Sequence, residues 1–208
     1  IIIDGGSTDN TIDIIHRYEH AIDYWISEKD EGVYDAMNKA SNLAKGEWIS
    51  YMNCGDSFCN NEVIEKIKFN HFSRYVIIHG NSKVFSGNRK LIKVQKSFRM
   101  NKFNLSIFAT GVACHQAVFY SKKINFNYPK KYKLKGELYS YFEYLKHGKA
   151  IRLDLNICNF FLGGMGSREK RKNNKEKWAV LKDQVGTMRF LHAPLSLLNN
   201  LRFYKNLQ

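Results

Sequence analysis

The first 80 residues alternate between short apolar runs and segments with helical spacing, and this alternation restricts the fold more than any other feature. We expect strands at 1–3, 24–26, 48–52 and 75–79, with helices at 9–20, 33–44 and 62–69. Such alternation is typical of a parallel sheet covered by helices. Three β-branched residues open the chain, as in the middle of a buried parallel strand, so we expect the start of the domain to be missing.

Polar clusters follow three of these expected strands directly. They are Asp4 with the glycines after it, residues 28–30, and residues 53–56. In open α/β sheets the ligand crevice forms at the carboxyl ends of the strands. We therefore expect the three clusters to border one binding site.

The second half of the chain is less regular. We expect a hairpin over 83–94, a strand just after His115-Gln116, an aromatic helix over 137–146, a strand over 151–161 and a glycine-rich loop at 163–167. A basic segment then leads into another helix. The predicted division is a catalytic-type domain at 1–167 and a basic, amphipathic helical extension at 168–208.

Charge is unevenly distributed: 33 Lys and Arg against 19 Asp and Glu give a net charge of +14. Residues 1–60 carry 4 basic and 11 acidic side chains, and residues 61–208 carry 29 and 8. An acidic first segment suits a divalent cation, and a basic remainder suits phosphate or an anionic membrane face. Simple solubility explains the basic excess equally well.

Other classes of protein are excluded by composition. A hydrophobic content of 44% excludes a disordered tail, and no run of about 18 apolar residues predicts a membrane-spanning helix. The four cysteines lack CxxC spacing, which favours free thiols in a reducing cytoplasm. Nucleic acid is not an expected partner, because a basic-aromatic recognition motif is absent.

The run SEKDEGVYDAMNKASNLAKGEWISYMNCGDSF (27–58), preceded by IIIDGGSTDNT, closely resembles family 2 glycosyltransferases. The likeness is greatest to the bacterial branch that builds lipopolysaccharide O-antigen, capsule and colanic-acid-type polysaccharides. It continues more thinly through CHQAVFY (114–120) and LGGMGS (162–167). The resemblance implies an α/β, GT-A type fold, N-terminally truncated, with a mostly parallel sheet flanked by helices.

The resemblance also implies an activity. Such a protein moves a sugar, with inversion, from a nucleotide-diphosphate sugar to a hydroxyl of a lipid-linked glycan, and uses Mg²⁺ or Mn²⁺. It would work in the cytoplasm, in peripheral contact with the inner membrane. A truncated paralogue that binds nucleotide without catalysis is the alternative.

Several residues match donor-binding positions of the family. Asp4, with Gly6 and Ser7, matches the turn that holds the nucleotide; an Asx-turn or helix cap is the alternative explanation of Asp4, and the surrounding motif favours the ligand role. Asp30, Gly32, Asp35 and Asn38 match positions near the donor. Asp35 could instead be a first-turn helix carboxylate, whereas an asparagine inside a helix is harder to explain by propensity.

A second group matches the reaction centre. The metal-binding Asp-x-Asp-Asp motif of the family is replaced by Asn53-Cys54-Gly55-Asp56, so Asp56 alone would hold the ion with phosphates and waters, unless it caps the following loop. His115 and Gln116 match a pair facing the pocket, although a structural histidine is the simpler reading.

Glu137 matches the point where the family often has an aspartate base. A base is needed because the attacking hydroxyl must lose a proton, while the cation offsets charge on the departing phosphate. As the first acidic residue of an expected helix, however, Glu137 needs no catalytic function at all.

Overall fold

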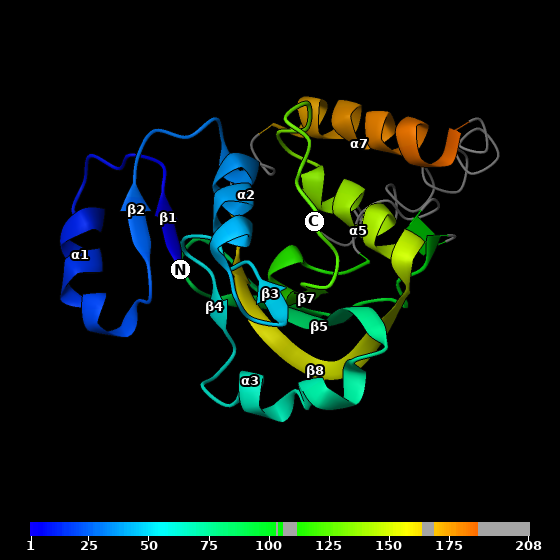
Figure 1. Cartoon of the computed structure of the whole chain (residues 1–208), viewed down its shortest axis with the longest axis horizontal. Helices are drawn as coiled ribbons and strands as arrows, with labels where there is room; N and C mark the ends of the chain where they lie inside the picture. Colours follow the sequence, from blue (N-terminus) through cyan, green and yellow to red (C-terminus); the bar gives the residue numbers. More distant parts are fainter. Residues whose placement is uncertain (103, 106–111, 164–168, 187–208) are drawn as a thin grey trace.

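The computed structural model describes residues 1–102, 104–105, 112–163 and 169–186, and Figure 1 shows its elements. The first half contains β1 (Ile2–Asp4), α1 (Thr11–Arg17), η1 (Glu19–Ala21), β2 (Trp25–Ser27), α2 (Val33–Leu43), β3 (Trp48–Ser50), β4 (Ser57–Phe58), α3 (Val63–Lys66) and η2 (Phe69–Phe72). The second half contains β5 (Tyr75–Phe85), β6 (Leu91–Gln95), η3 (His115–Ala117), β7 (Val118–Ser121), α5 (Gly136–His147), β8 (Lys149–Phe161) and α7 (Lys170–Val185).

The strands form two separate sheets. β1 and β2 pair in parallel and lie with α1 at one end of the molecule (Figure 1). The larger sheet has the order β3-β7-β5-β8-β4, with β6 paired to β5. The long strands β5 and β8 curve beneath α5 and α7 and give this sheet its curled shape.

The larger sheet is mixed, which corrects the expectation of a mostly parallel one. Among its described strands, β5 and β8 pair in parallel, while the pairs β3–β7, β5–β7, β4–β8 and β5–β6 are antiparallel. β5 and β6 form the expected hairpin, which joins antiparallel strands without a crossover helix. β7 lies between β3 and β5 in the sheet, although it follows both of them in the sequence. Local spacing does not encode such a pairing.

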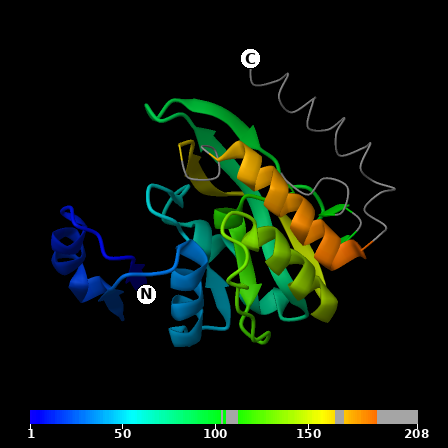
Figure 2. The ribbon, with the colours of Figure 1, turned by 90° about the horizontal axis from the view of Figure 1, so that it is seen from above.

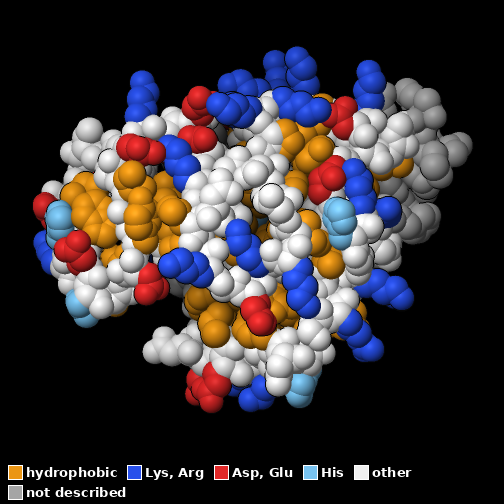
Figure 3. All heavy atoms as spheres, viewed as in Figure 1, with side chains coloured by type: hydrophobic (Ala, Val, Ile, Leu, Met, Phe, Trp, Pro, Cys, Tyr) orange, Lys and Arg blue, Asp and Glu red, His pale blue; other side chains and the backbone are white. Residues whose placement is uncertain are grey.

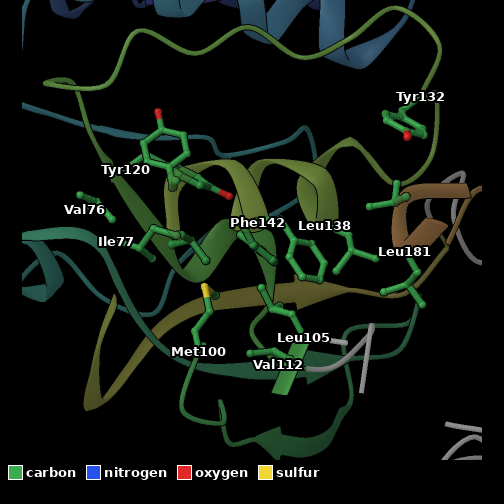
Figure 4. Packing of buried hydrophobic residues seen from close by; sticks show 14 residues of the cluster. Val76, Ile77, Met100, Leu105, Val112, Tyr120, Tyr132, Leu138, Phe142 and Leu181 are labelled. Carbon is green, nitrogen blue, oxygen red and sulfur yellow. The ribbon is translucent and has the colours of Figure 1, made fainter. Parts of the chain in front are cut away.

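Helices cover both faces of the larger sheet. On one face α5 and α7 pack over β5 and β7, and Figure 4 shows Leu138 and Phe142 of α5 beside Leu181 of α7. On the other face Val63 and Ile67 pack against Ile78, Phe119 and Ile157. Figure 2, a view from above, shows α7 lying alongside α5. Burying a side chain of this size stabilises a fold by about 1.5–3 kcal/mol.

Most expected elements are present, with shifted ends. The helix expected at 9–20 is divided into α1 and η1, and that expected at 62–69 is only one turn, α3, followed by η2. The strand expected at 75–79 continues to Phe85 as β5. Within the described ranges, no helix is both long and apolar enough to cross a membrane. The glycine-rich loop from 164 onward and the tail after 186 lie outside the described residues.

Candidate active site

A hollow of about 1230 Å³ lies among α2, β3, η3 and the start of α5. Most of the residues proposed from the sequence as site residues line it, namely Asp30, Gly32, Asn53, Asp56, His115, Gln116 and Glu137. These residues come from widely separated parts of the chain. The fold therefore brings three carboxylates, an imidazole and two amides to one concave surface.

Asp56 lies in the loop after β3 and is fixed by two neutral donors. Its Oδ1 accepts a hydrogen bond from the Phe161 amide at 2.9 Å, and its Oδ2 accepts one from Gln116 Nε2 at 2.8 Å. Burial raises the pKa of Asp56, and the two hydrogen bonds only partly offset this effect. Gln116 therefore contacts Asp56 directly, and its contact with a donor stays a prediction.

Glu137 lies in the first turn of α5 and is held by charged and polar groups. Lys135 Nζ lies 3.1 Å from Glu137 Oε1, and the Tyr34 hydroxyl donates a hydrogen bond to Oε2. Burial acts to raise the pKa of Glu137, but Lys135, the Tyr34 hydrogen bond and His115 together bring this pKa below its usual value. The side chain is therefore ionised at neutral pH, as a general base must be.

His115 lies between these two carboxylates in sequence and lines the same hollow. Its Nδ1 is 3.1 Å from Tyr120 Oη. Its ring stacks on that of Tyr51, with the two ring centroids 5.6 Å apart. Burial lowers the pKa of His115 to about 4, so the ring is neutral at pH 7.

Three buried polar atoms without a hydrogen-bond partner lie in the wall of the hollow. His115 Nε2, Ser50 Oγ and Tyr141 Oη are buried without a hydrogen-bond partner, and all three residues line the hollow. Such atoms are uncommon, because each costs about 1–3 kcal/mol. A polar ligand in the hollow could satisfy these atoms, whereas His79, Ser82 and Ser97 carry such atoms away from the hollow.

Asp30 lines the hollow, whereas the nearby Asp4 does not. Asp30 lines the hollow and accepts a hydrogen bond from the Gly32 amide at 2.8 Å. A Cβ on Gly5 would lie 2.6 Å from Asp30 Oδ2, so the turn after β1 abuts this carboxylate. Asp4 itself does not appear among the lining residues.

The Asp4 carboxylate is engaged within its own turn. It accepts hydrogen bonds from the amides of Gly6 (3.0 Å) and Ser7 (2.8 Å) and from the hydroxyls of Ser7 (2.5 Å) and Ser27 (2.6 Å). The two hydroxyl bonds contribute most to lowering the pKa of Asp4 to about 2. This is the Asx-turn arrangement weighed above, and contact of Asp4, Gly6 or Ser7 with a nucleotide stays a prediction.

Asp35 and Asn38 lie on a side of α2 that does not border the hollow. Asn38 Nδ2 donates to the Tyr128 carbonyl at 3.0 Å, and Asn38 Oδ1 accepts from the Tyr128 amide at 2.7 Å. Asp35 accepts from the Glu31 amide at 3.2 Å and pairs with Lys39 at 3.4 Å. Asn38 thus fixes a loop to α2, which explains an asparagine inside a helix without a ligand.

The donor set for a divalent cation is small. Among the described residues no group of three or more His, Cys, Asp or Glu side chains is placed to hold a metal ion. The undescribed segments contain no Asp or Glu. Asp56 faces the hollow and keeps lone pairs beyond its two hydrogen bonds. Mg²⁺ commonly binds one or two carboxylates together with substrate phosphates and water. The described residues fit that kind of site.

Three side chains around Glu137 were not among the sequence-based candidates. Tyr34 and Lys135 contact the carboxylate directly, and Glu176 of α7 accepts hydrogen bonds from the backbone just before it. Tyr34 lies within the run 27–58 that carries the family resemblance, and this position in the motif could have marked it as a candidate. No local pattern connects Glu176 with residues 133–135, because 41 or more positions separate them.

Comparison with known sequences identifies the class of protein that this fold and site define. Residues 1–134 match the family described as Glycosyl transferase family 2, so the chain belongs to that family. A "PGL/p-HBAD biosynthesis glycosyltransferase" of Mycobacterium bovis (strain BCG / Pasteur 1173P2) is 30% identical over 128 residues, which cover 59% of this chain and 47% of that protein.

An "uncharacterized glycosyltransferase" of Haemophilus influenzae (strain ATCC 51907 / DSM 11121 / KW20 / Rd) is 27% identical over 84 residues, 39% of this chain and 34% of that protein. The chain therefore spans half or less of the length of these relatives.

Solved structures show the same fold at low sequence identity. S. aureus TarS 1-349 in complex with UDP-GlcNAc superimposes with a TM-score of 0.64 at 12% identity, over 89% of this chain and 57% of that one. The mannosyltransferase PcManGT from Pyrobaculum calidifontis, in complex with GDP-Man and Mn²⁺, gives a TM-score of 0.60 at 13% identity, over 88% and 54%. The expected GT-A class of α/β fold is thereby confirmed.

Proposed function

We propose that this protein transfers a sugar, with inversion, from a nucleotide-diphosphate sugar to a hydroxyl of a lipid-linked glycan in the synthesis of a bacterial surface polysaccharide. The observation that carries the proposal is the hollow that holds Glu137, Asp56, Asp30 and His115 together. The structural relatives bound to UDP-GlcNAc and GDP-Man support a donor of this class.

In this proposal Glu137 is the base that takes the proton of the acceptor hydroxyl. It is ionised at neutral pH because Lys135 and Tyr34 favour the charged form. Asp30, Gly32, Asn53 and the His115-Gln116 pair bind the donor. Asp56 would hold Mg²⁺ or Mn²⁺, and a bound ion would stabilise charge on the departing diphosphate.

Two described strands beside the hollow are each paired on one side only. Among the described strands β1 pairs only with β2, and β3 pairs only with β7. Ile1 and Ile3 line the hollow, as do Trp48, Ile49 and Ser50 of β3. In the described part of the chain, open strand edges of both sheets therefore border the hollow.

Peripheral membrane contact is also proposed, and the β5–β6 hairpin supports it. Leu91, Ile92 and Val94 are 44–48% exposed, beside the exposed Arg89 and Lys90. Figure 3 shows Lys and Arg side chains gathered over α7 as well. Apolar and basic side chains together favour an anionic bilayer surface. Binding of the chain to phosphatidylglycerol vesicles, but not to phosphatidylcholine vesicles, tests this part.

The main experiment measures donor binding and hydrolysis with a panel of UDP-, GDP- and dTDP-sugars in the presence of Mg²⁺. We expect one nucleotide class to bind, Asp56→Ala to abolish the Mg²⁺-dependent part, and Glu137→Gln to reduce turnover while binding persists. Asp13→Asn, an exposed change in α1, is the matched control. Binding without turnover would favour the non-catalytic paralogue, and absence of binding across the panel would refute the proposal.

A further inference from the structure

The Glu137 carboxylate is contacted by a tyrosine from a distant helix. Tyr34 lies in the first turn of α2, is 8% exposed, and donates its hydroxyl hydrogen to Glu137 Oε2. Its ring stacks on Tyr128 with centroids 4.9 Å apart. Tyr128 is fixed by both groups of the Asn38 amide. The position of the Tyr34 ring is therefore fixed by its stacking on an anchored Tyr128 ring.

Gly136 makes the approach of this ring possible. A Cβ at position 136 would lie 2.8 Å from Tyr34 Cζ and 2.9 Å from Cε1 and Cε2. Carbon atoms of real side chains do not approach so closely, so any larger residue would displace the ring. A glycine directly before Glu137 thus lets the tyrosine reach the carboxylate.

Glu176 of α7 fixes the backbone that leads into Glu137. Its Oε2 accepts hydrogen bonds from the amides of Lys133 (3.0 Å), Leu134 (2.7 Å) and Lys135 (3.0 Å). Three successive amides directed at one carboxylate leave this segment a single conformation. Lys135, whose ammonium group pairs with Glu137 Oε1, is carried on that segment.

We propose that Tyr34 and Glu176 are positioning residues for Glu137: Tyr34 orients the carboxylate directly, and Glu176 fixes the segment that presents Lys135 and Glu137 to the hollow. The inference rests on the proposed function, in which Glu137 is the base. A base is effective only when it is held within hydrogen-bond reach of the proton that it takes. Neither residue is assigned a proton-transfer step.

The first test uses Tyr34→Phe, which keeps the ring and removes the hydroxyl. Carboxyl NMR of the full chain should show the pKa of Glu137 rising by about one unit, because a hydrogen bond to its charged form is lost. Turnover of whichever nucleotide-sugar the wild type hydrolyses should fall about tenfold at pH 7. Its acid limb should move to higher pH, and the donor KM should stay within about twofold.

Tyr132→Phe is the matched control, because Tyr132 also donates to a carboxylate, that of Asp183, and neither residue lines the hollow. It should cost similar stability and leave the Glu137 pKa and the pH profile unchanged. Gly136→Ala, which pushes the Tyr34 ring aside, should reproduce the effect of Tyr34→Phe. Equal pKa values of Glu137 in wild type, Tyr34→Phe and Gly136→Ala would overturn the role of Tyr34.

The second test compares Glu176→Gln with Asp183→Asn, which removes the other α7 carboxylate that binds this loop region. Only Glu176→Gln should lower kcat, about tenfold, with donor KM preserved. Equal kcat in the two variants would overturn the role of Glu176. A wild type that hydrolyses no donor would refute the proposed function instead, while the NMR titration would still decide whether Tyr34 controls Glu137.

Discussion

Replacing Asn38 distinguishes its observed structural role from the donor-binding role that its motif implies. The amide makes two hydrogen bonds with the backbone of Tyr128, at 3.0 and 2.7 Å. Asn38→Ala removes both and leaves an amide and a carbonyl of Tyr128 without their partners. Each lost bond costs about 1 kcal/mol, and partial burial of the orphaned groups adds to this. We expect the free energy of unfolding to fall by about 2–4 kcal/mol.

Asn38→Asp sharpens the test because only its protonated form can donate to the Tyr128 carbonyl. The protonated form is favoured in the folded state, so the folded pKa of the new carboxyl lies above its unfolded value. The stabilising contact is present below the unfolded pKa and is lost as pH rises through the folded pKa. Relative to wild type, Asn38→Asp should therefore be less destabilised at pH 4 than at pH 7.

Urea unfolding at both pH values measures these effects, with Asn42→Ala on the exposed surface of α2 as the control. At urea concentrations where Asn38→Ala remains folded, nucleotide binding should match that of wild type. A loss of stability below about 0.5 kcal/mol, comparable to an ordinary surface change, would refute the structural role. Binding lost without a change in stability would restore the donor role.

Two further predictions concern acid stability. The pKa of Asp4 is about 2, below its model-compound value of 3.8, so the stability that it contributes is present above about pH 4 and lost as pH falls toward 2. Asp4→Asn should remove this dependence and cost about 1.5–3 kcal/mol at pH 7, measured by urea unfolding. Burial lowers the pKa of His79 from 6.5 to about 4, so stability should fall as pH drops from 6.5 toward 4. His79→Leu should recover roughly 3 kcal/mol of that loss. An unchanged pH profile of thermal unfolding would contradict the prediction for either residue.

Local pattern sufficed for much of the fold. The helix expected at 33–44 is α2, because its apolar residues recur at helical spacing and Met37 and Tyr34 reach the interior. The hairpin at 83–94 is β5 and β6, with a turn formed by small and flexible residues. Elements that depend on neighbouring residues were predictable because the information lies within a few positions.

Strand order and direction were not predictable in the same way. β7 pairs with both β3 and β5, although paired residues are at least 69 positions apart in the first case and at least 39 in the second. Which strands pair, and in which direction, is set by tertiary contacts between distant parts of the chain, which local spacing does not encode. The same reason hid Glu176, whose three amide partners are brought to it only by the docking of α7.

The two principal carboxylates of the hollow are distinguished by the groups that hold them, and this supports different roles. Asp56 is contacted by neutral donors, and burial raises its pKa. Glu137 is contacted by an ammonium group and a hydroxyl, and its pKa is lowered. Environments that push two carboxyl pKa values apart indicate distinct functions. A cation ligand can be ionised by the incoming ion itself, whereas a base must be ionised before the acceptor arrives. These surroundings support the proposed roles of Glu137 as the base and of Asp56 as the cation ligand, which the family resemblance implies on separate grounds.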